Sequence, residues 1–210
     1  MAFVGKDVLP VVADVTDAVA VDHAVALAVE TFGGLDLLVS NAGSFPEATP
    51  LESLSDASWD ATLALNLSAH QKLLRAAVPF LALGFDPAVV FVASKNVRAP
   101  GPGVAAYSVA KAGLTQLARV AAIELAPKGV RVNVVHPDAV FDTSLWTIEK
   151  IAQRAERYGL SAEQYRTRNL LGREIRSRDV ANAVARLLSS ELGATTGAQL
   201  PIDGGNDRTI

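Results

Sequence analysis

The 210-residue chain contains no cysteine, so it forms no disulfide bond and no thiolate metal site. Histidine is scarce as well: His23, His70 and His136 lie far apart and show no metal-ligand spacing. We therefore expect no metal site and interpret these as ordinary helix and loop histidines. Glycine is almost missing from the first 32 residues, where only Gly5 occurs. A glycine-rich turn of the kind that holds phosphate groups is consequently not found there.

Long apolar runs and a strong excess of one charge are also lacking. No apolar stretch reaches the roughly 18 residues of a membrane helix, and the N-terminus lacks the pattern of a signal peptide. The net charge of −3 is too small to indicate nucleic acid or an anionic membrane surface as a partner. The sequence thus predicts a cytoplasmic protein that acts on a small molecule.

Apolar residues make up 50% of the chain, which is sufficient for the core of one domain. Apolar runs rich in β-branched residues alternate with helical stretches, an order typical of parallel strands joined by crossover helices. The expected strands are 8–15, 35–40, 89–93, 130–135 and 199–202. The expected helices are 18–32, 56–83 with a break before Pro79, 105–125 and 178–189.

Tyr107 and Lys111 form the most informative pair of residues, because positions four apart share one face of a helix. A cation near a phenol favours the phenolate, so we expect Lys111 to lower the pKa of Tyr107. The phenol is then able to exchange a proton with a substrate hydroxyl. Tyrosine and lysine at this spacing are also common surface neighbours, and the pair alone is weak evidence of catalysis.

Polar residues at the ends of predicted strands strengthen the catalytic interpretation. Ser94 follows the apolar run 88–93, and Asn41-Ala42-Gly43 follows the run 35–40. Open α/β sheets bind ligands at the carboxyl ends of their strands. Asn66 lies in an apolar helical stretch, where a buried amide needs a hydrogen-bond partner.

Together these motifs resemble the short-chain dehydrogenase/reductase family, in order and in spacing along nearly the whole chain. The resemblance implies a Rossmann-like, doubly wound parallel sheet. The matching segments are Ala13-Asp14-Val15-Thr16-Asp17, Ser40-Asn41-Ala42-Gly43, Asn66, Ser94, Tyr107-Ser-Val-Ala-Lys111, Val130-Arg-Val-Asn133 and Ile202-Asp203-Gly204-Gly205.

The resemblance implies a catalytic tetrad. Tyr107 is then the acid/base, and Lys111 lowers its pKa and binds the nicotinamide ribose. Ser94 orients the substrate, and Asn66 holds a water in a proton relay. The implied cofactor is NAD, with NADP not excluded. Tyr107 is expected to contact the cofactor as well as the substrate. The other expected contacts are Asp14 and Val15 beside the adenine, Asn41, Ala42 and Gly43 along the groove, and Pro137 and Val140 near the nicotinamide.

A narrower resemblance is to the dehydrogenase half of bifunctional rhamnulose-phosphate aldolase/lactaldehyde dehydrogenase proteins. It is carried by Ala93-Ser-Lys-Asn96, Ala99-Pro-Gly101, Val134-Val-His-Pro-Asp-Ala-Val140 and Arg168-Asn-Leu-Leu171. This resemblance implies lactaldehyde as substrate, a place in rhamnose metabolism, and a fused or associated aldolase domain. In the wider family a threonine contacts the carboxamide of the nicotinamide, but Thr143 stands one place later than that pattern requires.

Compared with the family, residues 1–210 look like a partial cofactor-binding domain without the first two strands and the glycine-rich loop. Three placements are open for the strand expected at 8–15: it occupies the vacant position in the sheet beside 35–40, it pairs with another chain, or it detaches from the sheet. We expect the first, a five-stranded sheet, because an unpaired buried strand edge is costly. The missing helices leave apolar sheet surface uncovered, which predicts association, and the family resemblance implies a homo-oligomer.

Residues 141–177 differ from the rest in combining aromatic residues with arginines. They form either a mobile lid whose arginines face an anionic group, or a solvated helical insertion whose aromatics pack on the domain. Lys95 and Arg98, beside Ser94, either face the substrate or belong to a solvated loop. The aromatic residues and arginines of the segment 141–177 are Trp146, Tyr158, Tyr165, Arg154, Arg157, Arg166, Arg168, Arg173 and Arg176.

Three functions remain open at this point. The first is an NAD-dependent dehydrogenase acting on a small hydroxyaldehyde. The second is a catalytically incompetent fragment or structural partner that lacks the pyrophosphate loop. The third keeps the enzyme class and takes a sugar or a 3-oxoacyl thioester as substrate.

Overall fold

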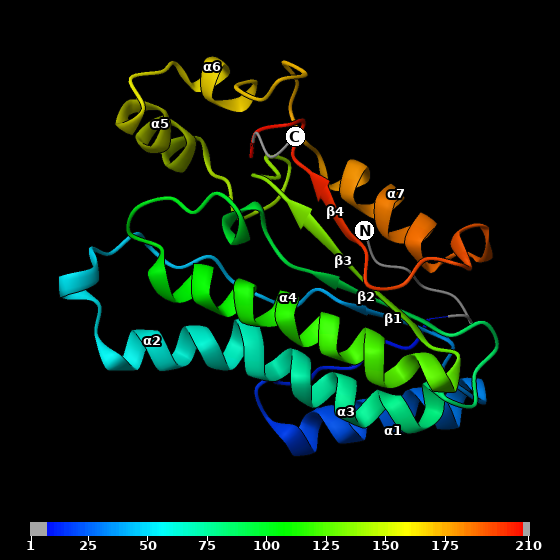
Figure 1. Ribbon diagram of the computed structural model, residues 1–210. Helices are drawn as coiled ribbons and strands as arrows, with labels where there is room; N and C mark the ends of the chain where they lie inside the picture. The colour runs from blue at the N-terminus through cyan, green and yellow to red at the C-terminus, as the bar shows by residue number, and fades with distance from the viewer. Residues whose placement is uncertain (1–7, 208–210) are drawn as a thin grey trace.

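The computed structural model describes residues 8–207, which form a single parallel sheet with helices on both faces (Figure 1). Its strands lie in the order β1 (Leu37–Ser40), β2 (Ala88–Val92), β3 (Arg131–Pro137) and β4 (Gln199–Ile202). Every strand is parallel to its neighbour, so the chain crosses over the sheet between strands. The predicted α/β class and Rossmann-like doubly wound sheet are confirmed.

Alternation along the central strands supplies the two faces of the core. Val89 and Phe91 point to the face covered by α3 (Ala69–Leu81) and α4 (Ala105–Leu125). Val90 points the other way and packs against α7 (Ser177–Leu188). A strand buried on both faces reads as a continuous apolar run, which is why this part of the sheet was predictable. Outside these layers, α1 (Ala18–Phe32) packs on α3.

Residues 8–15 do not form the strand that we expected, and the five-stranded sheet is wrong. The side chain of Val12 is fully exposed, and Pro10 lacks the N–H that a ladder requires. Instead, the carboxylate of Asp14 accepts a hydrogen bond of 2.8 Å from the backbone N–H of Thr16. This turn directs the chain into α1, whose N-cap is Asp17.

The edge of the sheet at β1, which residues 8–15 were expected to fill, is open, and apolar sheet surface is exposed there, as the sequence predicts for this part of the chain. Leu37 and Val39 pair with Ala88 and Val90 and therefore face the α7 side of the sheet. Helix α7 packs on β2, β3 and β4 and does not extend over β1. Leu37 and Val39 consequently keep 47% and 44% of their surface exposed. An open edge with apolar side chains favours pairing with another chain.

We expect the chain to associate in a concentration-dependent way through this β1 edge. Leu37→Lys places a charge on the edge and is expected to shift the mass distribution toward the monomer in light scattering. Leu51→Lys adds the same charge at another exposed leucine and serves as the control. If the parent and both variants show one identical mass distribution, the β1 edge is not the contact surface.

The long helix expected at 56–83 is present but is interrupted in a different place. It comprises α2 (Asp56–Leu63), a π-helical turn (Ala64–Ser68) and α3, which continues through Pro79 to Leu81. The break expected before Pro79 is wrong. The irregular turn instead contains Asn66, and such π-turns occur often at functional sites.

Residues 141–177 form a separate helical layer above the carboxyl ends of β3 and β4 (Figure 1). It contains α5 (Ile148–Arg157) and α6 (Ala162–Arg166), which enclose a small apolar cluster around Ile151 and Tyr165. A parallel bridge between Val140 and Ile175 joins its two ends. Among residues 8–207, no helix is both long and apolar enough to cross a membrane.

Candidate active site

A pocket of about 880 Å³ opens at the carboxyl ends of the strands, beneath the helical layer of residues 141–177. It brings together residues that are far apart in the sequence but follow successive strands or lie on α4. The site residues predicted from the sequence that line it are Asn41, Gly43, Asn66, Ser94, Tyr107, Lys111, Pro137 and Val140.

Ser94 lies just beyond the end of β2 and caps the short 3-10 helix Lys95–Val97. Its Oγ accepts a hydrogen bond of 3.2 Å from the backbone N–H of Asn96. Its carbonyl oxygen lies 3.1 Å from Nδ1 of the buried His136, which fixes the backbone at this point. The hydroxyl is thereby held at the edge of the sheet, where a ligand of an α/β fold is expected.

Tyr107 reaches the same place from α4, and its phenol interacts with the Ser94 side chain. The ring of Phe45 meets the Tyr107 ring edge-on, with 4.7 Å between the centroids. This contact fixes the ring and excludes water from one side of it. A phenol and a hydroxyl therefore point at one small volume of the pocket.

Lys111 lies one helical turn after Tyr107 and is almost completely buried. Its Nζ is 5.8 Å from the centre of the Tyr107 ring and donates a hydrogen bond of 2.9 Å to the Val92 carbonyl. An ammonium group has three donors. Since one is taken by the end of β2, the others are available to a ligand in the pocket.

Asn66 projects from the π-helical turn and is fully buried. Its Nδ2 donates to the Thr62 carbonyl at 3.1 Å, and its Oδ1 accepts from the Ser44 N–H at 3.3 Å. A Cβ on Gly43 would lie 2.8 Å from Asn66 Oδ1 and 3.6 Å from Lys111 Nζ. The absence of a side chain at position 43 is therefore what allows the turn after β1 to approach both residues.

Burial determines the ionisation of both helix residues. It raises the pKa of the Tyr107 phenol, although the hydrogen bond with Ser94 acts in the opposite direction. Burial also lowers the pKa of the Lys111 ammonium to about 8. Desolvation of the phenol therefore sets the direction of the shift, and the pKa of Tyr107 is raised, whereas the sequence suggested that Lys111 would lower it.

His70 is a buried neighbour of the site whose position the sequence did not reveal. Its Nδ1 lies 2.6 Å from the Ser40 hydroxyl at the end of β1. Desolvation, with the charge of Lys111 as a second cause, lowers the pKa of His70 to about 4, so the ring is neutral at ordinary pH. The available signal was its spacing, since His70 lies one helical turn after Asn66 and shares its face.

Three predicted cofactor residues do not line the pocket. Asp14 and Val15 lie in the turn before α1, and Ala42 is an exposed residue after β1 whose backbone is hydrogen-bonded to His70. Their cofactor contacts remain predictions. Thr143 does line the pocket, but its hydroxyl donates to the Val140 carbonyl at 2.9 Å.

The helical layer combines features of both interpretations of residues 141–177. Its aromatic side chains pack together, with Phe141 and Trp146 at a centroid distance of 5.1 Å. Arg154 and Arg168 nevertheless line the pocket. Lys95 does so too and pairs with Asp138 across 3.6 Å, which supports the substrate-facing position for this residue.

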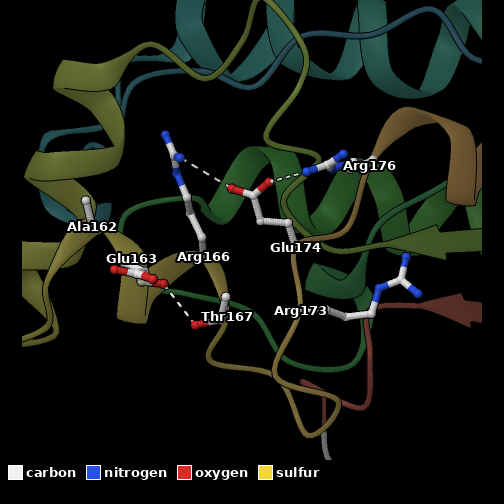
Figure 2. Close-up of a pocket in the computed structure, with 7 residues that line it drawn as sticks. All are labelled: Ala162, Glu163, Arg166, Thr167, Arg173, Glu174 and Arg176. Carbon is white, nitrogen blue, oxygen red and sulfur yellow. Dashed lines mark hydrogen bonds and ion pairs between the residues drawn. The ribbon is translucent and has the colours of Figure 1, made fainter.

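A second hollow of about 670 Å³ lies on α6 and the segment that follows it (Figure 2). In it, the Glu174 carboxylate sits between Arg166 and Arg176, with N–O distances of 3.3 and 3.5 Å. Here each arginine already faces a carboxylate. Within the described part of the chain, no group of acidic, histidine or cysteine side chains is arranged to hold a metal ion.

Comparison with known proteins identifies the family. A family model described as enoyl-(acyl carrier protein) reductase matches residues 2–207. The chain is 36% identical to an uncharacterised oxidoreductase, YuxG, of Bacillus subtilis, over 91% of this chain and 29% of that protein. It is 33% identical to human dehydrogenase/reductase SDR family member 4, over 88% of this chain and 64% of that protein. The chain thus belongs to the short-chain dehydrogenase/reductase family, and it spans less than two thirds of the length of these two relatives.

Solved structures agree with this assignment. Carveol dehydrogenase from Mycobacterium avium, in complex with NAD, is 30% identical and superposes with a TM-score of 0.84 over 91% of this chain and 72% of that one. Aldohexose dehydrogenase from Thermoplasma acidophilum is 27% identical, with a TM-score of 0.82 over 94% of this chain and 77% of that one.

Proposed function

We propose that the protein is an NAD-dependent oxidoreductase that interconverts a small alcohol and its carbonyl compound. The observation that carries this function is the meeting of Ser94, Tyr107, Lys111 and Asn66 in one pocket at the carboxyl ends of the strands. The names of its relatives, which include an uncharacterised NAD-dependent oxidoreductase of Mycobacterium tuberculosis, support it. A neighbour of known structure binds NADPH, so NADP is kept as an alternative cofactor.

The donor set of the pocket fits the nicotinamide end of such a cofactor. Lys111 has donors free for the ribose hydroxyls, and Asn41 and Gly43 line the groove beside it. Pro137 and Val140 supply an apolar wall at the end of β3. When bound, NAD supplies the acceptor or donor of the hydride.

The residues of the chain handle the proton that accompanies this hydride. During reduction, the Tyr107 phenol donates its proton to the carbonyl oxygen of the substrate, and the Ser94 hydroxyl hydrogen-bonds the same oxygen. Because burial raises its pKa, the phenol is protonated at neutral pH and is ready to act as the acid. During oxidation, the Tyr107 phenolate accepts the proton. Asn66, beside Lys111, is placed to hold a water that exchanges this proton with solvent.

The substrate class and the partners are finer proposals. The narrower resemblance supports a hydroxyaldehyde such as lactaldehyde, a role in rhamnose metabolism and an aldolase domain as partner. We further propose one domain over residues 1–210, with 141–177 as its substrate lid, and a homo-oligomer in the cytoplasm. A sugar or a 3-oxoacyl thioester fits the same four residues and is the alternative substrate.

A titration with NAD tests this function against a catalytically incompetent fragment. The alternative is motivated by the lack of a glycine-rich turn around the pocket within residues 8–207. We expect saturable binding in the micromolar to millimolar range that is usual for enzymes, measured by calorimetry, together with formation of reduced nicotinamide from a panel of secondary alcohols. No binding and no turnover would leave the fragment interpretation in place.

A further inference from the structure

The pocket carries a marked excess of positive charge. Its lining contains the cationic residues Lys95, Lys111, Lys150, Arg154 and Arg168 but only one acidic residue, Asp138. Asp138 already pairs with Lys95 at 3.6 Å and accepts a hydrogen bond from Asn206. Lys111 is engaged with the end of β2. Lys150, Arg154 and Arg168 are therefore left without a carboxylate partner among the described residues that line the pocket.

Arg154 extends from α5 toward the catalytic tyrosine. Its guanidinium carbon lies 5.0 Å from the centre of the Phe45 ring, and Phe45 contacts Tyr107 at 4.7 Å. These two successive contacts keep the guanidinium within about 10 Å of the Tyr107 ring. A guanidinium stacked on a ring keeps its N–H edges free for an anion.

Arg168 reaches the same region from the segment after α6. Its guanidinium carbon lies 4.9 Å from the Tyr158 ring centre and 4.5 Å from that of Tyr165. Burial raises the pKa of Tyr165, whereas the charges of Arg168 and Arg154 both lower it. Two arginines from different parts of the helical layer therefore act on one aromatic cluster at the rim of the pocket.

We propose that the substrate carries a carboxylate or a phosphate, and that Arg154 and Arg168 bind this group a few bonds away from the reacting carbon. This substrate class presupposes the proposed oxidoreductase function and replaces a neutral hydroxyaldehyde such as lactaldehyde as the substrate. Guanidinium groups bind carboxylate and phosphate through paired N–H donors, which gives orientation as well as affinity. Held at that end, the substrate presents its hydroxyl or carbonyl to Ser94 and Tyr107.

The second hollow provides an internal comparison. Arg166 and Arg176 also face a cavity there, but the Glu174 carboxylate lies between them (Figure 2). An anion entering that hollow would have to displace Glu174. In the active-site pocket no carboxylate of the described chain pairs with Arg154 or Arg168, so an incoming anion meets free donors.

The test combines matched substrates with Arg154→Gln. The substrate pairs are 3-hydroxybutyrate against 2-butanol, for the carboxylate, and glycerol 3-phosphate against 1,2-propanediol, for the phosphate. One of the two anions is expected to give a kcat/KM at least about tenfold above its neutral partner. Arg154→Gln is expected to lower that value about 10- to 100-fold, mainly through KM, as loss of a charged hydrogen-bond pair predicts. The neutral substrates should change by less than about threefold.

Arg157→Gln is the control, because Arg157 is exposed on the same helix and does not line the pocket. Arg154→Lys keeps the charge without the paired donors and should recover only part of the loss. The affinity for NAD, measured by calorimetry, should stay the same in every variant. An affinity for NAD that falls as far as that for the anionic substrate would assign Arg154 to the cofactor and overturn the proposal.

Binding of inorganic phosphate and of malonate to the cofactor-free protein separates this proposal from the proposed function. Anion binding that is lost in Arg154→Gln supports the anion site even if none of the alcohols is oxidised, a result that would count against the oxidoreductase function alone. Turnover of neutral alcohols that equals or exceeds turnover of the anions, with no effect of Arg154→Gln, overturns the proposal and leaves the oxidoreductase function standing.

Discussion

Replacing Tyr107 with phenylalanine is expected to lower kcat by roughly 10²–10⁴-fold, the usual contribution of a positioned acid or base. The phenol is the group in the pocket that is placed to exchange a proton with a substrate oxygen beside Ser94. The ring contact with Phe45 involves the Tyr107 ring and not its hydroxyl, so phenylalanine preserves the packing. The measurement is steady-state reduction and oxidation, with circular dichroism as the check of the fold.

Tyr158→Phe is the matched control, since Tyr158 also lines the pocket and loses the same atom. Its hydroxyl lies beside Gly101, 3.8 Å from where a Cβ on that glycine would be, and kcat should change by less than about threefold. Binding of NAD should be retained by both variants, because the cofactor contacts assigned to the chain are centred on Lys111. Turnover that survives intact in Tyr107→Phe removes the chemical basis of the proposed mechanism.

The centre of the sheet was predictable because β2 and β3 are buried on both faces. Continuous apolar runs such as 88–93 occur where a strand has helices above and below it. The three crossover connections between the four parallel strands follow from this pattern. Residues 8–15 show the limit of this reasoning. Val11 and Val12 favour a strand locally, but strand formation requires a partner edge, and the competing turn at Asp14 takes this segment into α1.

The site was predictable where a residue type and its spacing encode the contact. Ser94, Tyr107 and Lys111 meet because one follows a strand end and two share a helix face. The direction of the pKa shift of Tyr107 was not predictable, because it depends on how deeply the folded chain buries the phenol. Phe45 and Arg154 escaped notice as a pair, since their contact joins the turn after β1 to a helix that lies over it.

The π-helical turn at Asn66 shows both what the sequence predicts and what it does not. The apolar pattern of residues 56–83 predicts one helix and does not show the extra residue in the turn. The buried amide was nevertheless a sound indication, because a polar side chain in that position needs partners, and it finds them in Thr62 and Ser44. The irregular turn thereby fixes an amide beside Gly43 and Lys111, at the point where the chemistry is proposed.

Replacing Lys111 with methionine is expected to lower kcat/KM for reduced nicotinamide cofactor by roughly 10²–10³-fold, as loss of a pre-positioned electrostatic donor does. Methionine fills a similar volume but supplies neither a charge nor a donor to the ribose. The pH dependence of the same kcat/KM also tests the role of Lys111. This rate constant reports groups of the free enzyme, and carbonyl reduction needs a protonated Tyr107 and a charged Lys111.

Because burial lowers the pKa of Lys111 to about 8 and raises that of Tyr107, the lysine is the first of the two to lose its proton as the pH rises. The parent should therefore show a plateau at neutral pH and a fall as the pH passes about 8. In Lys111→Met the plateau is lower, and the fall moves to the higher pH at which Tyr107 ionises. Lys128→Met, at an exposed lysine beyond α4, should keep the profile of the parent. A fall that stays near the same pH in Lys111→Met would show that another group sets it, and that the buried ammonium is not what the reaction depends on.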